Sequence, residues 1–128
     1  MLQDIGLRKS HSFAQMLLSG GHPIISQKTM DLAIQNHTPT MNESRGIGFL
    51  YVDERYNQTG TLFPVGSFGH CGHTGISLFV NRETGLYVII LSDATVSTIQ
   101  KYGHEDYVQV IQMRQIIHTL IQKDLTNQ

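Results

Sequence analysis

The sequence predicts an α+β fold in which an antiparallel sheet is flanked by helices. Three observations lead to this prediction. Residues 13–46 carry apolar side chains at helical spacing, residues 47–93 contain strand-like segments, and residues 105–124 return to helical spacing. The order helix, helix, strands, helix is typical of a sheet with helices packed beside it. With 128 residues, the chain is expected to form a single domain.

Composition excludes several classes of protein. Nine Lys and Arg against ten Asp and Glu give a formal charge of −1, so the strongly basic surface of a sequence-tolerant nucleic-acid binder is absent. The longest apolar run, residues 86–91, is far too short to span a membrane. No secretion signal follows Met1, so the chain as given is expected to be cytoplasmic. The single cysteine, Cys71, excludes an internal disulfide.

The N-terminal third predicts two short helices. Residues 1–12 carry no clear pattern and receive no assignment. Phe13, Met16 and Leu17 have helical spacing, and the glycines at 20 and 21 end that run. Ser26 is a candidate N-cap for a second helix that ends near Pro39. The apolar stripe expected on this second helix, with a core-packed histidine, is Met30, Ala33, Ile34 and His37.

The middle of the chain predicts the strands. Residues 47–52 form a first candidate strand, and residues 66–73 are extended and rich in glycine. Residues 76–80 alternate as a strand does, and the polar turn at 81–85 ends in a glycine. Residues 86–91 are apolar on both faces, which predicts a central strand covered on both sides.

A C-terminal helix is expected over residues 105–124. Its predicted core-facing stripe is Val110, Met113, Ile117, Leu120 and Ile121. Its predicted solvent-facing side chains are Gln112, Arg114, Gln115 and Lys123, with His118 at the edge between the two faces.

The densest group of chemically useful residues lies at 69–75. Three glycines there allow close backbone approach, while His70, Cys71 and His73 could transfer protons or bind a metal. Tight sheet packing, with both histidines at a solvated edge, explains the same pattern equally well. Neighbouring residues of a strand point to opposite faces, so His70 and Cys71 could not share one ion, and two ligands make a poor zinc site. We therefore expect neither a metal nor another cofactor.

Six segments in the same order resemble a known family. Residues 68–80 (FGHCGHTGISLFV) resemble F-G-H-T-G-F-T-G-T-S-L-W-V, the C-terminal signature of the β-lactamase-related serine hydrolases. Residues 13–21 (FAQMLLSGG) are similar to F-A-Q-M-L-L-N-G-G of that family, and residues 85–93 (GLYVIILSD) to D-L-Y-V-V-L-L-S-N. Further similar segments occur at 25–30, at 36–39 and at 46–49. The resemblance covers residues ~13–122 and implies the C-terminal part of the β-lactamase/transpeptidase-like fold.

Two of the motifs that such hydrolases use are absent from the sequence. The family, which includes class C β-lactamases, penicillin-binding proteins, DD-peptidases and esterases, carries its nucleophile in Ser-x-x-Lys. No serine of this chain has a lysine three residues later, and no tyrosine has an asparagine two residues later, as Tyr-x-Asn requires. The nucleophile and its base are therefore missing from these 128 residues.

The resemblance assigns the third motif, Lys/His-Thr-Gly, to residues 70–72. In the family this motif lies on an edge strand that forms one wall of the cleft. His70 would face the substrate, Gly72 would keep the wall flat, and the amide of His73 would be an oxyanion donor. Cys71 replaces the usual threonine and loses its hydroxyl. A second register, with the motif at residues 73–75, keeps the threonine but reverses the faces of the strand that follows.

These observations leave three functions open. The first is the C-terminal portion of a serine hydrolase that acts on an ester, amide or β-lactam, inactive by itself. The second is a non-catalytic truncated paralogue that acts as a binding or assembly module, and the third, a metal-binding domain, is disfavoured. A small molecule or peptide is the substrate expected of the full-length enzyme. In the resembled fold, the strand that matches residues 86–91 pairs on its far side with an N-terminal strand that these residues do not include. The edge that this would leave bare predicts a homo-oligomer.

Overall fold

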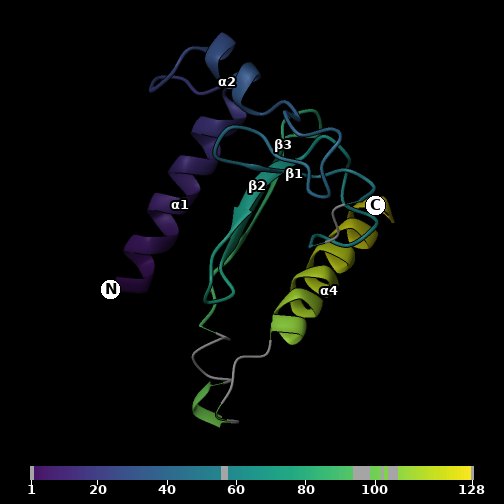
Figure 1. Cartoon of the computed structure of the whole chain (residues 1–128). Coiled ribbons are helices and arrows are strands. Elements are labelled where there is room, and N and C mark those ends of the chain that lie inside the picture. The colour runs from purple at the N-terminus through teal and green to yellow at the C-terminus, as the bar shows by residue number, and fades with distance from the viewer. Residues whose placement is uncertain (1, 56–57, 94–98, 102, 104–106, 128) are drawn as a thin grey trace.

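A computed structural model describes residues 2–55, 58–93, 99–101, 103 and 107–127 of the chain. Helices α1 (Leu2–Leu18) and α4 (Tyr107–Thr126) cover opposite faces of a four-stranded antiparallel sheet (Figure 1). The short helix α2 (Gln27–Ala33) lies beyond the C-terminal end of α1. The predicted α+β class is confirmed. None of the helices in the described part of the chain has the length and apolar character needed to cross a membrane.

The strands follow one another across the sheet in chain order. They are β1 (Leu50–Tyr51), β2 (Phe68–Cys71), β3 (Ser77–Asn81) and β4 (Leu86–Ile90). The register places Gly69 opposite Phe79 and Phe79 opposite Val88. A Cβ added at Gly69 would lie 2.0 Å from the carbonyl oxygen of Leu78, so any larger residue would force the two strands apart.

β4 lies at an edge of the sheet, so the prediction of a central strand at residues 86–91 is wrong. Its side chains are nonetheless covered on both faces. Val88 and Ile90 are buried on the side of α4, while Tyr87 is half-buried on the side of α1. The apolar residues on both faces of β4 therefore indicate that a helix covers each face. They do not indicate whether β4 has a neighbouring strand on one edge or on both.

β1 is shorter than the strand predicted at residues 47–52. The amide of Ile47 donates to the carbonyl oxygen of Ala33 at the end of α2, 2.8 Å away, and so is not available to a sheet partner. A Cβ at Gly46 would lie 2.3 Å from that same oxygen. The chain is thus held against α2 before it can enter the sheet, which limits β1 to two residues.

The helices at the N-terminus also differ from expectation. α1 begins at Leu2, so most of the segment left unassigned is helical, while Ala14 and Leu17 are buried against the sheet. Ser26 caps α2 as predicted, accepting a hydrogen bond from the amide of Thr29 at 3.2 Å. α2 ends at Ala33, and residues 34–46 are not helical, contrary to the prediction. His37 is exposed and does not pack in the core.

Two clusters of buried side chains fill the two sides of the sheet. The cluster under α4 consists of Leu50, Val52, Phe63, Phe79, Val88 and Ile90. The cluster under α1 consists of Leu17, Met30, Phe68 and Val80. β3 contributes Phe79 to one and Val80 to the other, and both are fully buried.

The buried face of α4 includes most of the predicted stripe and extends beyond it, since Met113, Ile117 and Ile121 pack against the core as expected. Val110 is buried as expected, but Arg114 and His118, expected at the polar face and at its edge, are buried too. Leu120, expected in the stripe, is 61 % exposed. Residues 110, 114 and 118 follow one another at four-residue spacing and therefore share one side of the helix. Because Arg114 and His118 are polar, the hydrophobic pattern of the sequence did not indicate that they are buried.

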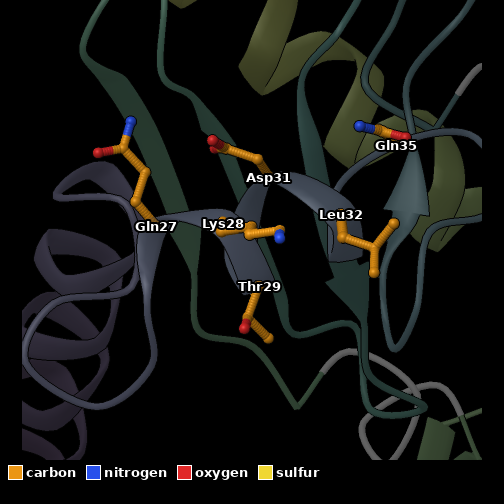
Figure 2. Close-up of a pocket in the computed structure, with 6 residues that line it drawn as sticks. All are labelled: Gln27, Lys28, Thr29, Asp31, Leu32 and Gln35. Carbon is orange, nitrogen blue, oxygen red and sulfur yellow. The ribbon is translucent and has the colours of Figure 1, made fainter.

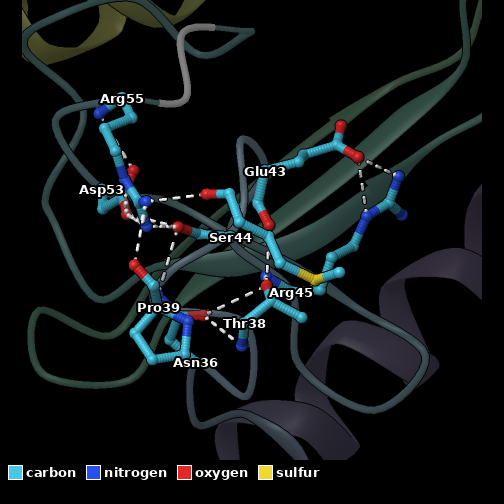
Figure 3. A network of polar contacts seen from close by, with 9 residues as sticks. Asn36, Thr38, Pro39, Glu43, Ser44, Arg45, Asp53 and Arg55 are labelled. Atoms are coloured by element: carbon cyan, nitrogen blue, oxygen red, sulfur yellow. Dashed lines mark hydrogen bonds and ion pairs between the residues drawn. The ribbon is translucent and has the colours of Figure 1, made fainter.

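A polar network fixes the loop between α2 and β1 (Figure 3). The buried hydroxyl of Ser44 donates to the carboxylate of Asp53 and accepts from Arg55, whose guanidinium also donates to the carbonyls of Pro39 at 3.1 Å and Met41 at 2.9 Å. Partial burial by itself raises the pKa of Asp53. The hydrogen bonds from Ser44 and Arg55, with the positive charge of Arg55, outweigh it and lower that pKa from 3.8 to about 2. Asp53 is thus a structural anion that holds this loop together.

His118 is a buried imidazole held between aromatic rings. Its ring centroid lies 4.6 Å from that of Phe63 and 5.7 Å from that of Phe79, both in edge-to-face geometry. Neither ring nitrogen has a hydrogen-bond partner in the described structure. Burial, assisted by the nearby positive charge of Arg114, lowers the pKa of His118 from 6.5 to about 4.

We expect acid to destabilise the fold through His118. The unfolded chain binds this proton below pH 6.5 and the folded chain only near pH 4, so the free energy of unfolding should fall across that interval by about 3 kcal/mol. Urea unfolding followed by circular dichroism at pH 7, 5.5 and 4.5 measures the fall. His118→Leu should flatten it, whereas the control His37→Gln, at an exposed histidine, should leave it unchanged. If the free energy of unfolding falls equally with pH in His118→Leu, groups other than His118 cause the fall.

Candidate functional site

The residues predicted for the site lie where β2 runs past the end of β1. β1 pairs with Phe68 and Gly69, and the pairing stops there. His70 and Cys71 are paired with β3 on one side, while on the other side no strand of the described structure pairs with them. The second half of β2 is therefore a strand edge, as the resemblance implies, although its first half lies inside the sheet.

His70 and Cys71 point to opposite faces of the sheet, as strand alternation predicts. His70 shares its face with Phe68 and with Leu78, the side covered by α1, and it is exposed. Its Nδ1 lies 2.9 Å from the carbonyl oxygen of Cys71. Cys71 packs against the core under α4, and its thiol donates to Oε1 of Gln58 at 3.3 Å.

The backbone turns immediately after Cys71. The amide of Gly72 donates to the carbonyl of Ile76 at 2.7 Å, and Gly75 has a φ of +99°, which favours glycine. Gly72 and His73 are both exposed. His73 lies in the turn, beyond the end of the strand, so the strand ends before the residue predicted to provide an oxyanion donor.

Arg114 is the residue of this region that sequence reasoning missed. It is 4 % exposed, and it extends from α4 to the turn between β2 and β3. Nη2 donates to the carbonyls of Gly72 at 3.0 Å and Ile76 at 3.1 Å, and Nη1 donates to Oε1 of Gln58. Its four-residue spacing from Val110 and His118 was the available signal.

Arg114 also joins Gln58 to the strand. Oε1 of Gln58 accepts from both the guanidinium and the thiol of Cys71. A cavity of about 200 Å³ opens beside these groups. Its lining is formed by Gln58, Cys71, Gly72, His73, Val110, Ile111 and Arg114. The cavity thus brings together three of the four predicted site residues, and His70 is outside it on the other face.

Another hollow, along α2, offers a weaker candidate. It measures about 590 Å³, and Figure 2 shows its lining side chains spread along α2 and just beyond its end rather than converging on a point. Asp31, one of them, is already paired with Arg82 at 2.6 Å. Among the residues that the structure describes, no group of three or more His, Cys, Asp or Glu side chains could hold a metal ion. The end of β2 therefore remains the candidate site.

Comparison with known proteins finds a similar fold among solved structures. No protein-family model matches the sequence, and no curated protein matches it. Among solved structures, a β-lactamase from Mycobacterium bovis matches with a TM-score of 0.69 and 18 % sequence identity. The chain has the fold of part of a β-lactamase. The match covers 88 % of this chain and 41 % of the β-lactamase, so well over half of that fold has no counterpart here.

We expect Arg114 to hold the turn after Cys71 in place. Replacing it with methionine removes a charged donor from two carbonyls and from Gln58, so the free energy of unfolding should fall by about 2–3 kcal/mol. Cys71 should also react faster with iodoacetamide, because the contacts that cover its thiol loosen. Chemical unfolding and mass spectrometry of the alkylated chain measure the two effects.

Lys123→Met, at an exposed position of the same helix, is the matched control and should change neither quantity. In the unmodified chain Cys71 should alkylate slowly at pH 6. Rapid single-site alkylation there would contradict the interpretation of Cys71 as a packed thiol with no role as a nucleophile.

Proposed function

We propose that this chain is the C-terminal portion of a β-lactamase/penicillin-binding-protein-like serine hydrolase and supplies one wall of the substrate cleft. The observation that supports this most is the fold match over 88 % of the chain, together with the family-like segments in the same order. In the full-length enzyme the reaction would be acyl transfer to a serine followed by hydrolysis. The acceptor serine and its lysine would come from the part of the fold that has no counterpart here.

In this proposal His70 faces the substrate. It is exposed on the α1 side of the sheet, at the segment of β2 that β1 leaves unpaired. A neutral imidazole can accept or donate a hydrogen bond near pH 7, and a protonated one would attract a carboxylate. Gly72 lacks a side chain, so a substrate can lie close to the backbone beside it. The amide of His73 is the proposed oxyanion donor.

Cys71 would support the cleft wall from the α4 side of the sheet. Its side chain packs into the core under α4, so it would not contact a substrate that lies on the His70 face. The hydrogen bond that the usual threonine hydroxyl could give a substrate would be lost. The contacts of Cys71 and Arg114 with Gln58 would hold the end of the strand in position. The alternative function, a non-catalytic truncated paralogue, needs the same fold but no substrate contact at His70.

The isolated chain should hydrolyse neither a chromogenic cephalosporin nor a nitrophenyl ester above a heat-denatured control. The physical reason is the absence of Ser-x-x-Lys from these 128 residues. Loss of a nucleophile leaves other serine hydrolases a residual acceleration of only ~10³–10⁴ over water, and that remainder requires a bound substrate. Turnover that is titrated by an acylating inhibitor, on a residue mapped inside this chain, would contradict the proposal.

A chimera tests whether this chain can form one wall of a working substrate cleft. This chain would replace the matching segment of the M. bovis β-lactamase, and circular dichroism would establish that the chimera is folded. We expect the chimera to hydrolyse a chromogenic cephalosporin, and we expect His70→Ala in the same chimera to reduce kcat/KM. The control Ile116→Ala, at an exposed residue of α4, should leave the rate unchanged. A folded chimera whose rate does not depend on His70 would favour the non-catalytic alternative.

A further inference from the structure

Arg114 fixes one peptide group of the β2–β3 turn to α4. Its Nη2 donates to the carbonyls of Gly72 at 3.0 Å and Ile76 at 3.1 Å, and its Nε donates to the carbonyl of Gly75 at 3.4 Å. The carbonyl of Gly72 also accepts from the amide of Gly75 at 3.2 Å, while the amide of Gly72 donates to the carbonyl of Ile76 at 2.7 Å. Both backbone polar groups of Gly72 are therefore held on the side of the turn and of β3.

The orientation of Gly72 determines where the amide of His73 points. The carbonyl of Gly72 and the N–H of His73 belong to one peptide group, and in a trans peptide these two bonds point in opposite directions. Because the carbonyl points toward Arg114 and the amide of Gly75, the N–H of His73 points toward the opposite edge of β2. This is the edge along which β1 stops pairing at Gly69.

The side chain of His70 reaches the same edge. The amide of Gly72 points toward β3, so the carbonyl of Cys71, which shares its peptide group, points away from β3. Nδ1 of His70 lies 2.9 Å from that carbonyl. The imidazole that we propose to face the substrate and the amide that we propose as oxyanion donor are thus directed to one edge of β2.

We propose that Arg114 is a positioning residue for the oxyanion donor: by holding the carbonyl of Gly72, it keeps the N–H of His73 directed at the edge where the reacting group would lie. This inference rests on the proposed function, which makes His73 the donor. An oxyanion donor is effective only when it is already oriented toward the developing charge. Rotation about the backbone bonds of glycine costs less than at other residues, so the peptide after Gly72 needs a contact that fixes it. Arg114 is 4 % exposed, so water competes little for its hydrogen bonds.

The first test uses the folded chimera with the M. bovis β-lactamase. Arg114→Met removes the contacts with the turn, and Arg114→Lys keeps the charge but not the set of donors that the guanidinium provides. Loss of an oxyanion donor costs ~10²–10³ in kcat, and a misdirected donor should cost roughly 10- to 100-fold. KM should change little, because this contact forms chiefly in the transition state. Affinity for a boronic acid, which forms a negatively charged tetrahedral adduct with the serine, should fall by a factor similar to that in kcat.

Ile117→Ala is the matched control, because Ile117 packs against the core from the same helix. It should destabilise the fold and leave the affinity for the boronic acid unchanged. If Arg114 has only a structural role, Arg114→Met and Ile117→Ala should behave alike. Unchanged boronic acid affinity in folded Arg114→Met would overturn the inference. A folded chimera that is inactive with Arg114 in place would instead overturn the proposed function.

Nitrogen-15 relaxation of the 128-residue chain tests the positioning without any activity. The amide of His73 should have an order parameter of about 0.85 in the unchanged chain and below ~0.6 in Arg114→Met, as a flexible amide does. Ile117→Ala should leave it at the higher value. If Arg114→Met does not fold, Arg114→Lys provides the comparison. An order parameter at His73 that is equally high in a folded Arg114 variant would overturn the inference, whatever the activity of the chimera.

Discussion

The burial of β3 on both faces and along both edges is the constraint on which the rest of the structure depends. Phe79 and Val80 point to opposite sides and are fully buried, each in a different core cluster. α1 and α4 must therefore lie on opposite faces, and β2 and β4 must lie on either side. Every residue of the candidate site is placed through its pairing with β3 or through its contact with the turn that precedes it.

Arg114 connects α4 to the candidate site through the turn between β2 and β3. A guanidinium removed from water needs its donors satisfied, and here carbonyls of the β2–β3 turn and the amide of Gln58 satisfy them. The turn is thereby fixed to α4, and with it the end of β2. The edge of β2 at His70 has no partner strand beside it in the described structure, because the pairing with β1 stops at Gly69, and His70 itself is exposed.

Much of the fold could be predicted from local patterns. The strands at 76–80 and 86–91, the turn between them, the N-cap at Ser26 and the helix near the C-terminus all follow from spacing that neighbouring residues impose. The opposite directions of His70 and Cys71 follow from alternation alone. The family resemblance at residues 68–80 identified the fold that the structural match supports.

The sequence by itself thus determined most of the elements and their order, because those depend on contacts within a few residues. Tertiary structure alone decided that β4 is an edge strand, that β1 stops after two residues, and that Arg114 and His118 are buried. The physical reason is that these outcomes depend on partners distant in sequence: an arginine is buried only where carbonyls from another segment meet it, and an apolar strand is central only if a further strand lies beside it.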